Sequence, residues 1–569
     1  MRLRVVVAMS CCVLVTLVAV GAAGAQPWSQ DPVVVQTLSN RADLISGGDV
    51  LIEVLLPARA EAGDVRVAVA GRDVTDAFAV RGDGRFYGRV TGLATGVSRV
   101  TATLPDGSGA YLDVTNHPIG GPVFAGEQIQ PWACTTQDNG LGPAIDAQCN
   151  APAVVTFHYK DAVTGSFQSY DPDNPPPDAR VASITTDQGV TVPYIVRQER
   201  GAMDRGIYAV AVLFDPAQPW EPWAPQPGWN HKLYQTFGPG CYFQHNQGPA
   251  PNVLDDTRLS RGFLVTGSSL NTYNQNCNDV VSAEAFMMTK EHVIETYGEI
   301  RYTMTEGASG GSVLQDLMAD NYPGLADGIQ PTGVGFPDMW LVAAFDVPDC
   351  ELTQHYFSTA GMTWTPDQRG AVEGKQAAAT CAAINAEFGG SSALGAWWHP
   401  SGSCADAEAV YDPDTNPDGV RCTLADYMVS IFGRRPDGKA NRFLDNVGVQ
   451  YGLAALEAGD ISVAQFIDLN ATIGGMDIDG NFVPERMVAD PPALIAGYEV
   501  GYADGAEMDR VPIINYMTFT NADIHQAYAP QVLRARLIAA NGHADNQVLM
   551  NDGFDNPNSA ARSFALLDE

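Results

Sequence analysis

The pentapeptide Gly307-Ala308-Ser309-Gly310-Gly311 is the only G-x-S-x-G pattern in the chain. In such a pattern the serine sits on a sharp turn between a strand and a helix, and small neighbours leave room for that turn. A β-patterned run, 301–305, precedes it, and a helical stretch, 312–320, follows it. The pattern predicts that Ser309 is a nucleophile for acyl transfer. The alternative is a glycine-rich strand-to-helix turn with an exposed serine.

A serine nucleophile needs N–H donors for the negative charge that develops on the carbonyl oxygen. One donor is the backbone N–H of the residue after the nucleophile, here Gly310. The second is expected from a loop after an early strand, and Gly238-Pro239-Gly240-Cys241 follows the apolar run 233–237. Gly240 and Cys241 offer N–H groups there, whereas proline has none. A plain Pro-Gly turn stapled by Cys241 is the alternative.

The general base has to be a histidine, because only histidine titrates near pH 7 without a perturbed pKa. In the usual order of nucleophile, acid and base for such a turn, the histidine comes last. We predict His525, because it follows the β-patterned run 511–516 and catalytic groups project from strand ends. The segment after the last expected strand, 547–550, holds no histidine. The other histidines that follow Ser309 are His355, His399 and His543.

The acid of such a triad orients the imidazole and stabilises its charged form. Asp338 ends the run 334–337, which is typical of the strand after the nucleophile helix, and we predict Asp338 for this role. Asp349 and Asp523 are the rivals. Asp523 and His525 lie on one short loop, where two residues rarely orient each other's working nitrogen. Turns and helix caps account for most carboxylates, so they are the alternative for each.

Several segments together resemble a family of secreted bacterial α/β-hydrolases that is allied to tannases, feruloyl esterases and 3-hydroxybutyrate-oligomer hydrolases. The resemblance covers roughly residues 120–569. It implies an α/β-hydrolase fold and hydrolysis of carboxylic esters, and it does not settle the substrate. The segments that carry it are 236–241, 264–271, 307–311, 322–328, 411–413, 416–422 and 445–453.

The elements that would position these residues alternate between strands and helices. Such alternation predicts a mostly parallel sheet with flanking helices. Residues 350–500 break the rhythm with four cysteines and many Asp-Pro and Asn-Pro turns, which indicates a disulfide-rich lid insertion. The expected strands are 207–214, 233–237, 263–266, 301–305, 511–516 and 547–550, and the expected helices are 282–297, 312–320, 449–458 and 531–540.

The N-terminal part differs from the rest, because residues 31–117 contain no Cys and no Trp. Short Val-rich runs alternate there with Gly/Asp turns, which predicts a small all-β sandwich of immunoglobulin-like type. We therefore expect a sandwich domain over residues 26–117 and a catalytic domain over residues 118–569, which contains the insertion. The strand candidates are 33–38, 49–56, 65–70, 99–104 and 110–115.

Residues 1–25 read as a signal peptide. Two arginines precede the apolar run 5–20, and Ala23-Gly24-Ala25 offers small residues for cleavage. A membrane anchor is the alternative. Eight of the ten cysteines lie beyond this segment. An even number in an exported chain predicts four disulfides, and we expect cysteines that are neighbours in sequence to pair. The expected location is secreted or periplasmic.

The net charge of −34 excludes a nucleic-acid binder and argues against an anionic membrane surface as partner. We expect a small-molecule or oligomeric ester as substrate, no membrane partner after signal cleavage, and no cofactor or catalytic metal. Alternating oxygen-bearing side chains over 412–418 and 477–481 could hold a structural calcium ion. Ordinary Asx and proline turns are the alternative.

These observations favour a secreted serine hydrolase of carboxylic esters, through an acyl-enzyme on Ser309. An oligoester, a polyester or a plant phenolic ester would suit such an enzyme. Two alternatives stay open. One is a catalytically inactive binding protein with the same fold, and the other is an amidase or peptidase on the same scaffold.

Overall fold

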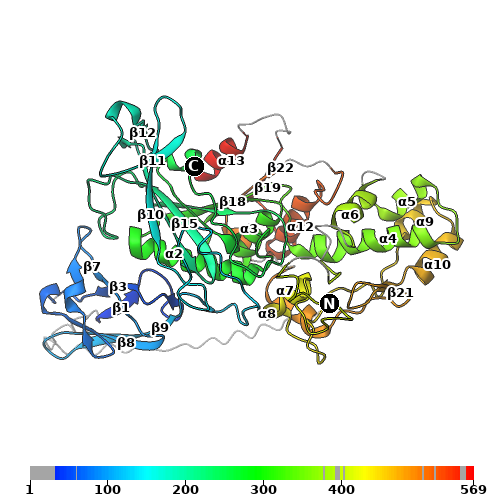
Figure 1. The fold of residues 1–569 in the computed structure, drawn as a ribbon, viewed down its shortest axis with the longest axis horizontal. Helices are drawn as coiled ribbons and strands as arrows, with labels where there is room; N and C mark the ends of the chain where they lie inside the picture. Colours follow the sequence, from blue (N-terminus) through cyan, green and yellow to red (C-terminus); the bar gives the residue numbers. More distant parts are fainter. Residues whose placement is uncertain are drawn as a thin grey trace, which may run out of the picture.

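The computed structural model describes residues 32–58, 60–375, 379–390, 397–400, 404–502, 505, 507–517, 521–551 and 559–569. The signal peptide expected over residues 1–25 lies outside these residues. Figure 1 shows paired N-terminal sheets at the lower left, a large sheet with helices in the middle, and a mainly helical region at the right.

The N-terminal sheets share one apolar core. Their inward side chains, such as Ile52, Val67 and Val100, form a single buried cluster. The neighbouring Leu51 points the other way and packs against Tyr87 and Ile294, as the two-residue repeat of a strand requires. The predicted strands of this region are present. The first sheet has the order β1 (Val34–Thr37), β3 (Val50–Leu55), β7 (Phe86–Val90), β6 (Phe78–Val80), and the second has the order β2 (Ile45–Ser46), β9 (Gly109–His117), β8 (Gly96–Thr103), β4 (Arg66–Val69), β5 (Arg72–Asp73).

A ten-stranded sheet forms the centre of the molecule. Its strands from β17 to β23 are parallel, but those from β11 to β15 are antiparallel, as is the pairing of β15 with β17. The sheet is therefore mixed, which corrects the expectation of a mostly parallel sheet. In spatial order the strands are β11 (Phe167–Tyr170), β10 (Val154–Lys160), β14 (Ile195–Met203), β15 (Gly206–Leu213), β17 (Leu264–Ser268), β16 (Lys232–Phe237), β18 (Tyr302–Ala308), β19 (Gly328–Gly333), β22 (Ile513–Met517) and β23 (Gln547–Met550).

The sequence analysis did not predict four strands of this sheet, β10, β11, β14 and β19, and of these β10 and β14 carry many polar residues. An antiparallel strand can be left partly open to solvent, as β10 is, and then lacks a continuous apolar run. In β10 only Tyr159 is fully buried. The apolar pattern that identified β15 and β16 is absent from such a strand.

Helices cover both faces of the central sheet. Helices α2 (Asp279–Tyr297) and α3 (Gly310–Asn321) pack on one face against Leu233 and Leu264. Helices α1 (Asp256–Leu259) and α13 (Ser559–Asp568) cover the other face, where Tyr234 and Val265 are buried. The side chains of successive residues in a strand thus pack into opposite helical layers. Helix α12 (Ala529–Asn541) packs beside β19 and β22.

A long insertion separates β19 from β22 and forms the mainly helical region at the right of Figure 1. This segment starts at residue 334, directly after β19, and so earlier than the expected start at residue 350. A π-helix, Leu341–Asp346, runs directly into α4. The expected helix at 449–458 begins only at Leu453, since Gly452 has a φ of 75°. The helices of the insertion are α4 (Val347–Thr359), α5 (Pro366–Glu373), α6 (Thr380–Phe388), α7 (Leu424–Tyr427), α8 (Val429–Phe432), α9 (Leu453–Ala458), α10 (Val463–Thr472) and α11 (Pro491–Glu499).

Four disulfides are present, and each joins cysteines that are neighbours in sequence, which confirms the expected pairing. They are Cys134–Cys149, Cys241–Cys277, Cys350–Cys381 and Cys404–Cys422. Within the described ranges, no helix has both the length and the apolar character needed to cross a membrane.

Candidate active site

Ser309 lies on the turn between β18 and α3, as its sequence pattern predicts. Its φ of 54° and ψ of −117° are unusual for a residue with a side chain. A Cβ atom at Gly307 or Gly311 would lie 2.8 Å or 2.7 Å from the carbonyl oxygen of Phe237. Only glycine fits at these two positions, so the motif is required by the close approach of the neighbouring strand.

A buried glutamine, Gln315, braces this turn from the first turns of α3. Its Nε2 atom donates to the carbonyl oxygens of Gly307 and Gly311, each at 3.1 Å. Its Oε1 atom accepts from the Thr305 hydroxyl at 2.8 Å and from the Gln330 N–H at 3.0 Å. One side chain thereby ties β18, the turn, α3 and β19 together. The sequence analysis missed this residue, because a lone glutamine in a helix carries no pattern.

The structure brings His525 to Ser309. Nε2 of His525 lies 3.1 Å from Oγ of Ser309. Nδ1 of the same ring lies 2.9 Å from Oδ1 of Asp523. The ring also packs against Phe336, with 5.4 Å between ring centroids. The serine, the imidazole and the carboxylate therefore form one continuous chain of polar contacts.

A tight loop after β22 allows Asp523 and His525, two residues apart in sequence, to contact each other. Oδ1 of Asp523 accepts the backbone N–H of His525 at 2.7 Å, which bends the loop in the manner of an Asx turn. The side chain of Asn521, whose φ is 55°, accepts the Ala527 N–H at 2.8 Å and closes the loop. The same carboxylate oxygen thus faces both the backbone and the ring of His525.

The insertion holds this loop from two sides. The Thr380 hydroxyl donates to the carbonyl oxygen of Asn521 at 3.1 Å. The Tyr528 hydroxyl donates to the carboxylate of Asp346 at 2.8 Å. Asp346 is 3% exposed and also pairs with Lys375. The position of the histidine loop is therefore coupled to the inserted helices.

Asp338, which the sequence analysis assigned as the acid, has partners other than the histidine. Strand β19 ends at Gly333, so the run 334–337 is not a strand and does not deliver Asp338 to the edge of the sheet. The carboxylate is fully buried, accepts the Leu341 N–H at 2.8 Å and pairs with Arg536 of α12. Burial raises the pKa of Asp338 although Arg536 favours its ionised form. The carboxylate that contacts the imidazole is that of its rival Asp523.

Three other candidates lie in different surroundings. Asp349 lies in α4, where burial raises its pKa to about 6. His355 stacks on Phe482 with 3.8 Å between ring centroids. His399 contacts Oε1 of Glu351 at 2.7 Å.

The loop that carries Gly240 and Cys241 lies directly against the nucleophile turn. A Cβ atom at Gly310 would lie 2.1 Å from the carbonyl oxygen of Gly240, whose own φ is 91°. The Cys241–Cys277 disulfide ties this loop to the segment after β17. Among hydrogen bonds between described residues, none uses the N–H of Cys241 or Gly310.

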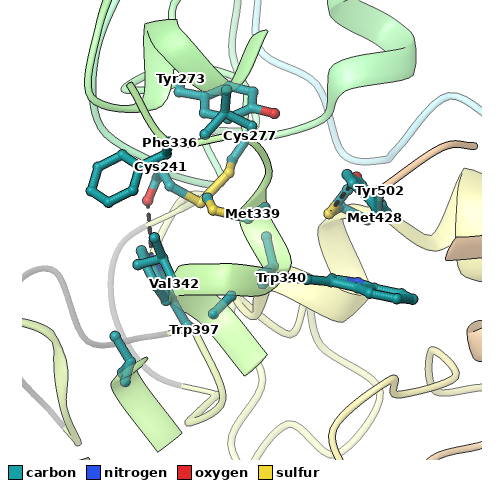
Figure 2. Packing of buried hydrophobic residues seen from close by; sticks show 14 of the residues in the cluster. Cys241, Tyr273, Cys277, Phe336, Met339, Trp340, Val342, Trp397, Met428 and Tyr502 are labelled. Atoms are coloured by element: carbon teal, nitrogen blue, oxygen red, sulfur yellow. Dashed lines mark hydrogen bonds between the residues drawn. A yellow bond between two sulfur atoms is a disulfide. The ribbon is translucent and has the colours of Figure 1, made fainter. Parts of the chain in front are cut away.

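A cavity of about 260 Å³ opens beside these groups. Ser309, His525, Gly240, Cys241 and Gly310 all line it. Its wall is largely apolar, and Figure 2 shows part of that wall around the Cys241–Cys277 disulfide. There the Trp397 indole N–H donates to the carbonyl oxygen of Cys241 at 3.4 Å. The apolar residues of the wall are Val313, Phe336, Met339, Val342, Phe388, Trp397 and Ile524.

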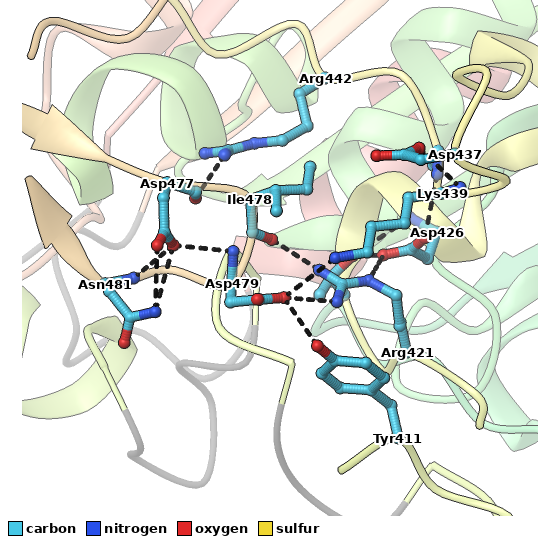
Figure 3. A network of polar contacts seen from close by, with 12 residues as sticks. Tyr411, Arg421, Asp426, Asp437, Lys439, Arg442, Asp477, Ile478, Asp479 and Asn481 are labelled. Carbon is cyan, nitrogen blue, oxygen red and sulfur yellow. Dashed lines mark hydrogen bonds and ion pairs between the residues drawn. The ribbon is translucent and has the colours of Figure 1, made fainter. Parts of the chain in front are cut away.

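The two acidic stretches weighed as calcium sites form turns. Oδ1 of Asp477 accepts the N–H groups of Asp479 and Asn481, each at 2.9 Å, and Asp479 pairs with Arg421 at 2.6 Å (Figure 3). Oδ1 of Asp412 similarly accepts the N–H groups of Asp414 and Thr415. In the described part of the chain, no group of three or more His, Cys, Asp or Glu side chains could hold a metal ion. The contacts favour the turn interpretation.

The fold and the site together define an α/β protein with a strained serine turn, a histidine–aspartate pair and an adjoining apolar cavity. The chain belongs to a tannase-like family of unknown function (DUF6351), whose model matches residues 35–569. This confirms the tannase-like resemblance. No curated protein matches the sequence.

Solved structures show distant likenesses. Feruloyl esterase B from Aspergillus oryzae is 12% identical, with 70% of this chain and 79% of that chain covered and a TM-score of 0.32. Tannin acyl hydrolase from Aspergillus niger is also 12% identical, with 76% of this chain and 86% of that chain covered and a TM-score of 0.31. Likenesses at this level assign neither a fold nor a substrate to this chain.

Proposed function

We propose that this protein hydrolyses carboxylic esters through an acyl-enzyme formed on Ser309. The observation that carries the proposal is the chain of contacts from Ser309 Oγ through the His525 ring to Asp523, at 3.1 Å and 2.9 Å. A nucleophile, a base within hydrogen-bond reach and a group that orients the base are the parts that acyl transfer needs. The tannase-like family supports ester hydrolysis as the reaction.

In this mechanism His525 accepts the proton of the Ser309 hydroxyl as Oγ attacks the ester carbonyl. The negative charge that develops on the carbonyl oxygen is stabilised by the N–H groups of Gly310 and Cys241. The C–O bond to the alcohol then breaks, and His525 returns the proton to the departing alcohol oxygen. A water molecule attacks the acyl-enzyme by the same route and releases the acid and free Ser309.

Asp523 takes the role that the sequence analysis gave to Asp338. Its Oδ1 atom accepts Nδ1–H of His525, so Nε2 is left without a proton and can act as the base. Asp523 also stabilises the imidazolium that forms in the transition state. Gly240 shapes the oxyanion loop through its positive φ, while the Cys241 N–H is the donor.

The alternative that this protein is an inactive binding protein loses its main support. That interpretation rested on the absence of a histidine after the last strand, β23. His525, from the loop after the neighbouring strand β22, occupies that place in the contact chain. Amide or peptide hydrolysis uses the same groups, so the choice between acyl substrates is a matter for direct assay.

The surrounding parts fit an exported enzyme. Four disulfides suit an oxidising compartment, so we place the protein outside the cytoplasm, secreted or periplasmic, after removal of residues 1–25. We propose that residues 26–117 form a separate sandwich domain and that the insertion acts as a lid. Phe388 and Trp397 of the insertion support the lid, because both line the cavity beside Ser309.

The test is turnover of p-nitrophenyl acetate and butyrate, followed by labelling with a serine-directed phosphonate. Ser309→Ala should lose at least about 10³-fold in kcat and all labelling, with an unchanged melting temperature. His525→Ala should cost about as much, and the double variant should be little worse, since such residues act as a unit. A Ser309→Ala protein that keeps more than a few per cent of the activity would refute the proposal.

A further inference from the structure

The loop that carries His525 is held at each end by a different helical segment of the insertion. At its start, the Thr380 hydroxyl donates to the carbonyl oxygen of Asn521 at 3.1 Å. At its end, the Tyr528 hydroxyl donates to both carboxylate oxygens of Asp346, each at 2.8 Å. The insertion therefore contacts this loop on both sides of the proposed base.

One disulfide joins the two helices that carry these contacts. Thr380 and Cys381 are the first two residues of α6, and Cys350 lies in the first turn of α4, directly after Asp346 and the π-helix. The Cys350–Cys381 disulfide connects α4 to α6, and the two helices pack side by side (Figure 1). Both cysteines are fully buried. The disulfide therefore restricts how far the two contacts can move relative to each other.

A shift of this loop would change the contact of the imidazole with Ser309 more than its contact with Asp523. Asp523 and His525 are joined locally within the loop, so they move together. Ser309 lies on the turn between β18 and α3, which belong to the central sheet and its covering helices. The separation of 3.1 Å between His525 Nε2 and Ser309 Oγ therefore depends on where the insertion holds the loop.

We propose that Thr380 and Asp346 are positioning residues for His525. The Cys350–Cys381 disulfide keeps the two at a fixed separation. The proposal rests on the ester hydrolysis proposed above. A general base must lie about 2.6–3.2 Å from the atom whose proton it accepts, and a misplacement of about 1 Å can cost on the order of 10²-fold in rate. The insertion thereby contributes to the chemical step, in addition to the lid role proposed for it.

The first experiment removes the hydroxyl at the start of the loop. Thr380→Val keeps the shape of the side chain but leaves the Asn521 carbonyl oxygen without this donor. We expect kcat for p-nitrophenyl butyrate to fall about tenfold, with KM changed by less than about twofold. Thr380→Ser keeps the hydroxyl and should retain close to the wild-type rate. Thr289→Val is the matched control, because it removes a buried hydroxyl that donates to the Ala285 carbonyl oxygen within α2, and it should leave kcat unchanged.

The contact at the other end of the loop has its own test. Tyr528→Phe removes the hydroxyl that Asp346 accepts and keeps the ion pair of Asp346 with Lys375. We expect kcat to fall about three- to tenfold at an unchanged KM. Tyr194→Phe is the matched control, because that hydroxyl also donates to a carboxylate, that of Asp256 at 2.8 Å, and it should leave kcat unchanged.

A further experiment removes the disulfide. The double variant Cys350→Ala/Cys381→Ala should lose about ten- to hundredfold in kcat at a nearly unchanged KM. Labelling of Ser309 by the phosphonate should slow by the same factor, because it needs the same base. In the control, Cys134→Ala/Cys149→Ala, neither cysteine lies in the insertion or among the described residues that line the cavity. Both variants should lose thermal stability, but at a temperature where both are folded only the first should lose activity.

The outcomes separate this proposal from the proposed function. If Thr380→Val and Cys350→Ala/Cys381→Ala keep the wild-type kcat while their melting temperatures fall, the contacts are only structural and the positioning role is wrong. If Thr380→Ser loses as much rate as Thr380→Val, the assignment to the hydroxyl fails. Should the double cysteine variant not fold, the Thr380 variants decide alone. A wild-type protein that neither hydrolyses the ester nor reacts with the phosphonate would refute ester hydrolysis itself.

Discussion

Nδ1 of His525 lies 2.9 Å from Oδ1 of Asp523, a residue only two positions earlier in the same loop. Because the Asx-type turn joins that oxygen to the His525 N–H as well, the relative position of ring and carboxylate depends on one short segment. The proposed base and its orienting acid thus form one local unit. Only Ser309 has to be brought to it from another strand.

Asp523→Asn should lower kcat for a p-nitrophenyl ester by about 10² to 10⁴-fold, because the amide no longer holds the imidazole in its working tautomer. Asp338→Asn is the matched comparison. It removes the charge that pairs with Arg536 and should lower the melting temperature while kcat stays within a few-fold. Steady-state kinetics and thermal unfolding of both variants check this. A larger loss of kcat in Asp338→Asn than in Asp523→Asn would restore the original assignment.

Gln315→Met should both destabilise the protein and impair catalysis. The thioether cannot replace the bonds to Gly307, Gly311, Thr305 and Gln330, and each buried polar group left without a partner costs roughly 1–3 kcal/mol. We expect a clear drop in melting temperature and a lower kcat at an unchanged KM. Gln137→Met, at an exposed position, serves as control. An active, fully stable Gln315→Met protein would show that the turn keeps its shape without this brace.

Stability should decrease as the pH rises from about 5 to about 8. Burial of Glu291, between α2 and the N-terminal strands, raises its pKa to about 8 although Ser46 and Asn40 donate hydrogen bonds to it. The folded state therefore keeps a proton that the unfolded chain, with a glutamate pKa of about 4.3, releases. Stability conferred by this proton is complete at low pH and is lost as the pH approaches the folded-state value.

Glu291→Gln should flatten that decline, since the amide cannot ionise and still accepts the Ser46 N–H. Melting temperatures measured between pH 5 and pH 8.5 provide the check, with the exposed Glu457→Gln as control. Parallel pH profiles for wild type and Glu291→Gln would show that Glu291 is not responsible for the loss.

A chain that begins at residue 118 should still hydrolyse a small soluble ester within a few-fold of the full-length rate. None of the described residues that line the cavity lies before Pro239, so we expect the chemistry not to depend directly on the N-terminal sheets. The melting temperature should fall, because Ile294 of α2 would lose its contacts with Leu51 and Tyr87. Specific activity and thermal unfolding are the measurements. A truncated protein that folds but turns nothing over would show that these sheets contribute to the site.

Local features of this protein were predictable from its sequence. The strained turn at Ser309 follows from glycines that no larger residue could replace, and the buried strands β15, β16 and β17 follow from apolar runs. The pairing of neighbouring cysteines was also correct, and the expected base His525 lies 3.1 Å from Ser309. Each of these depends on short-range sterics or on the repeat of a single element, which a sequence displays directly.

Long-range packing decided the rest. Asp338 and Asp523 look alike in sequence, and only the end of β19 and the bend after Asn521 determine which carboxylate reaches the imidazole. The antiparallel half of the sheet and the hydrogen bonds of Gln315 likewise involve residues far apart in the chain. Such contacts depend on how whole elements pack in three dimensions, and no local pattern of residues encodes them.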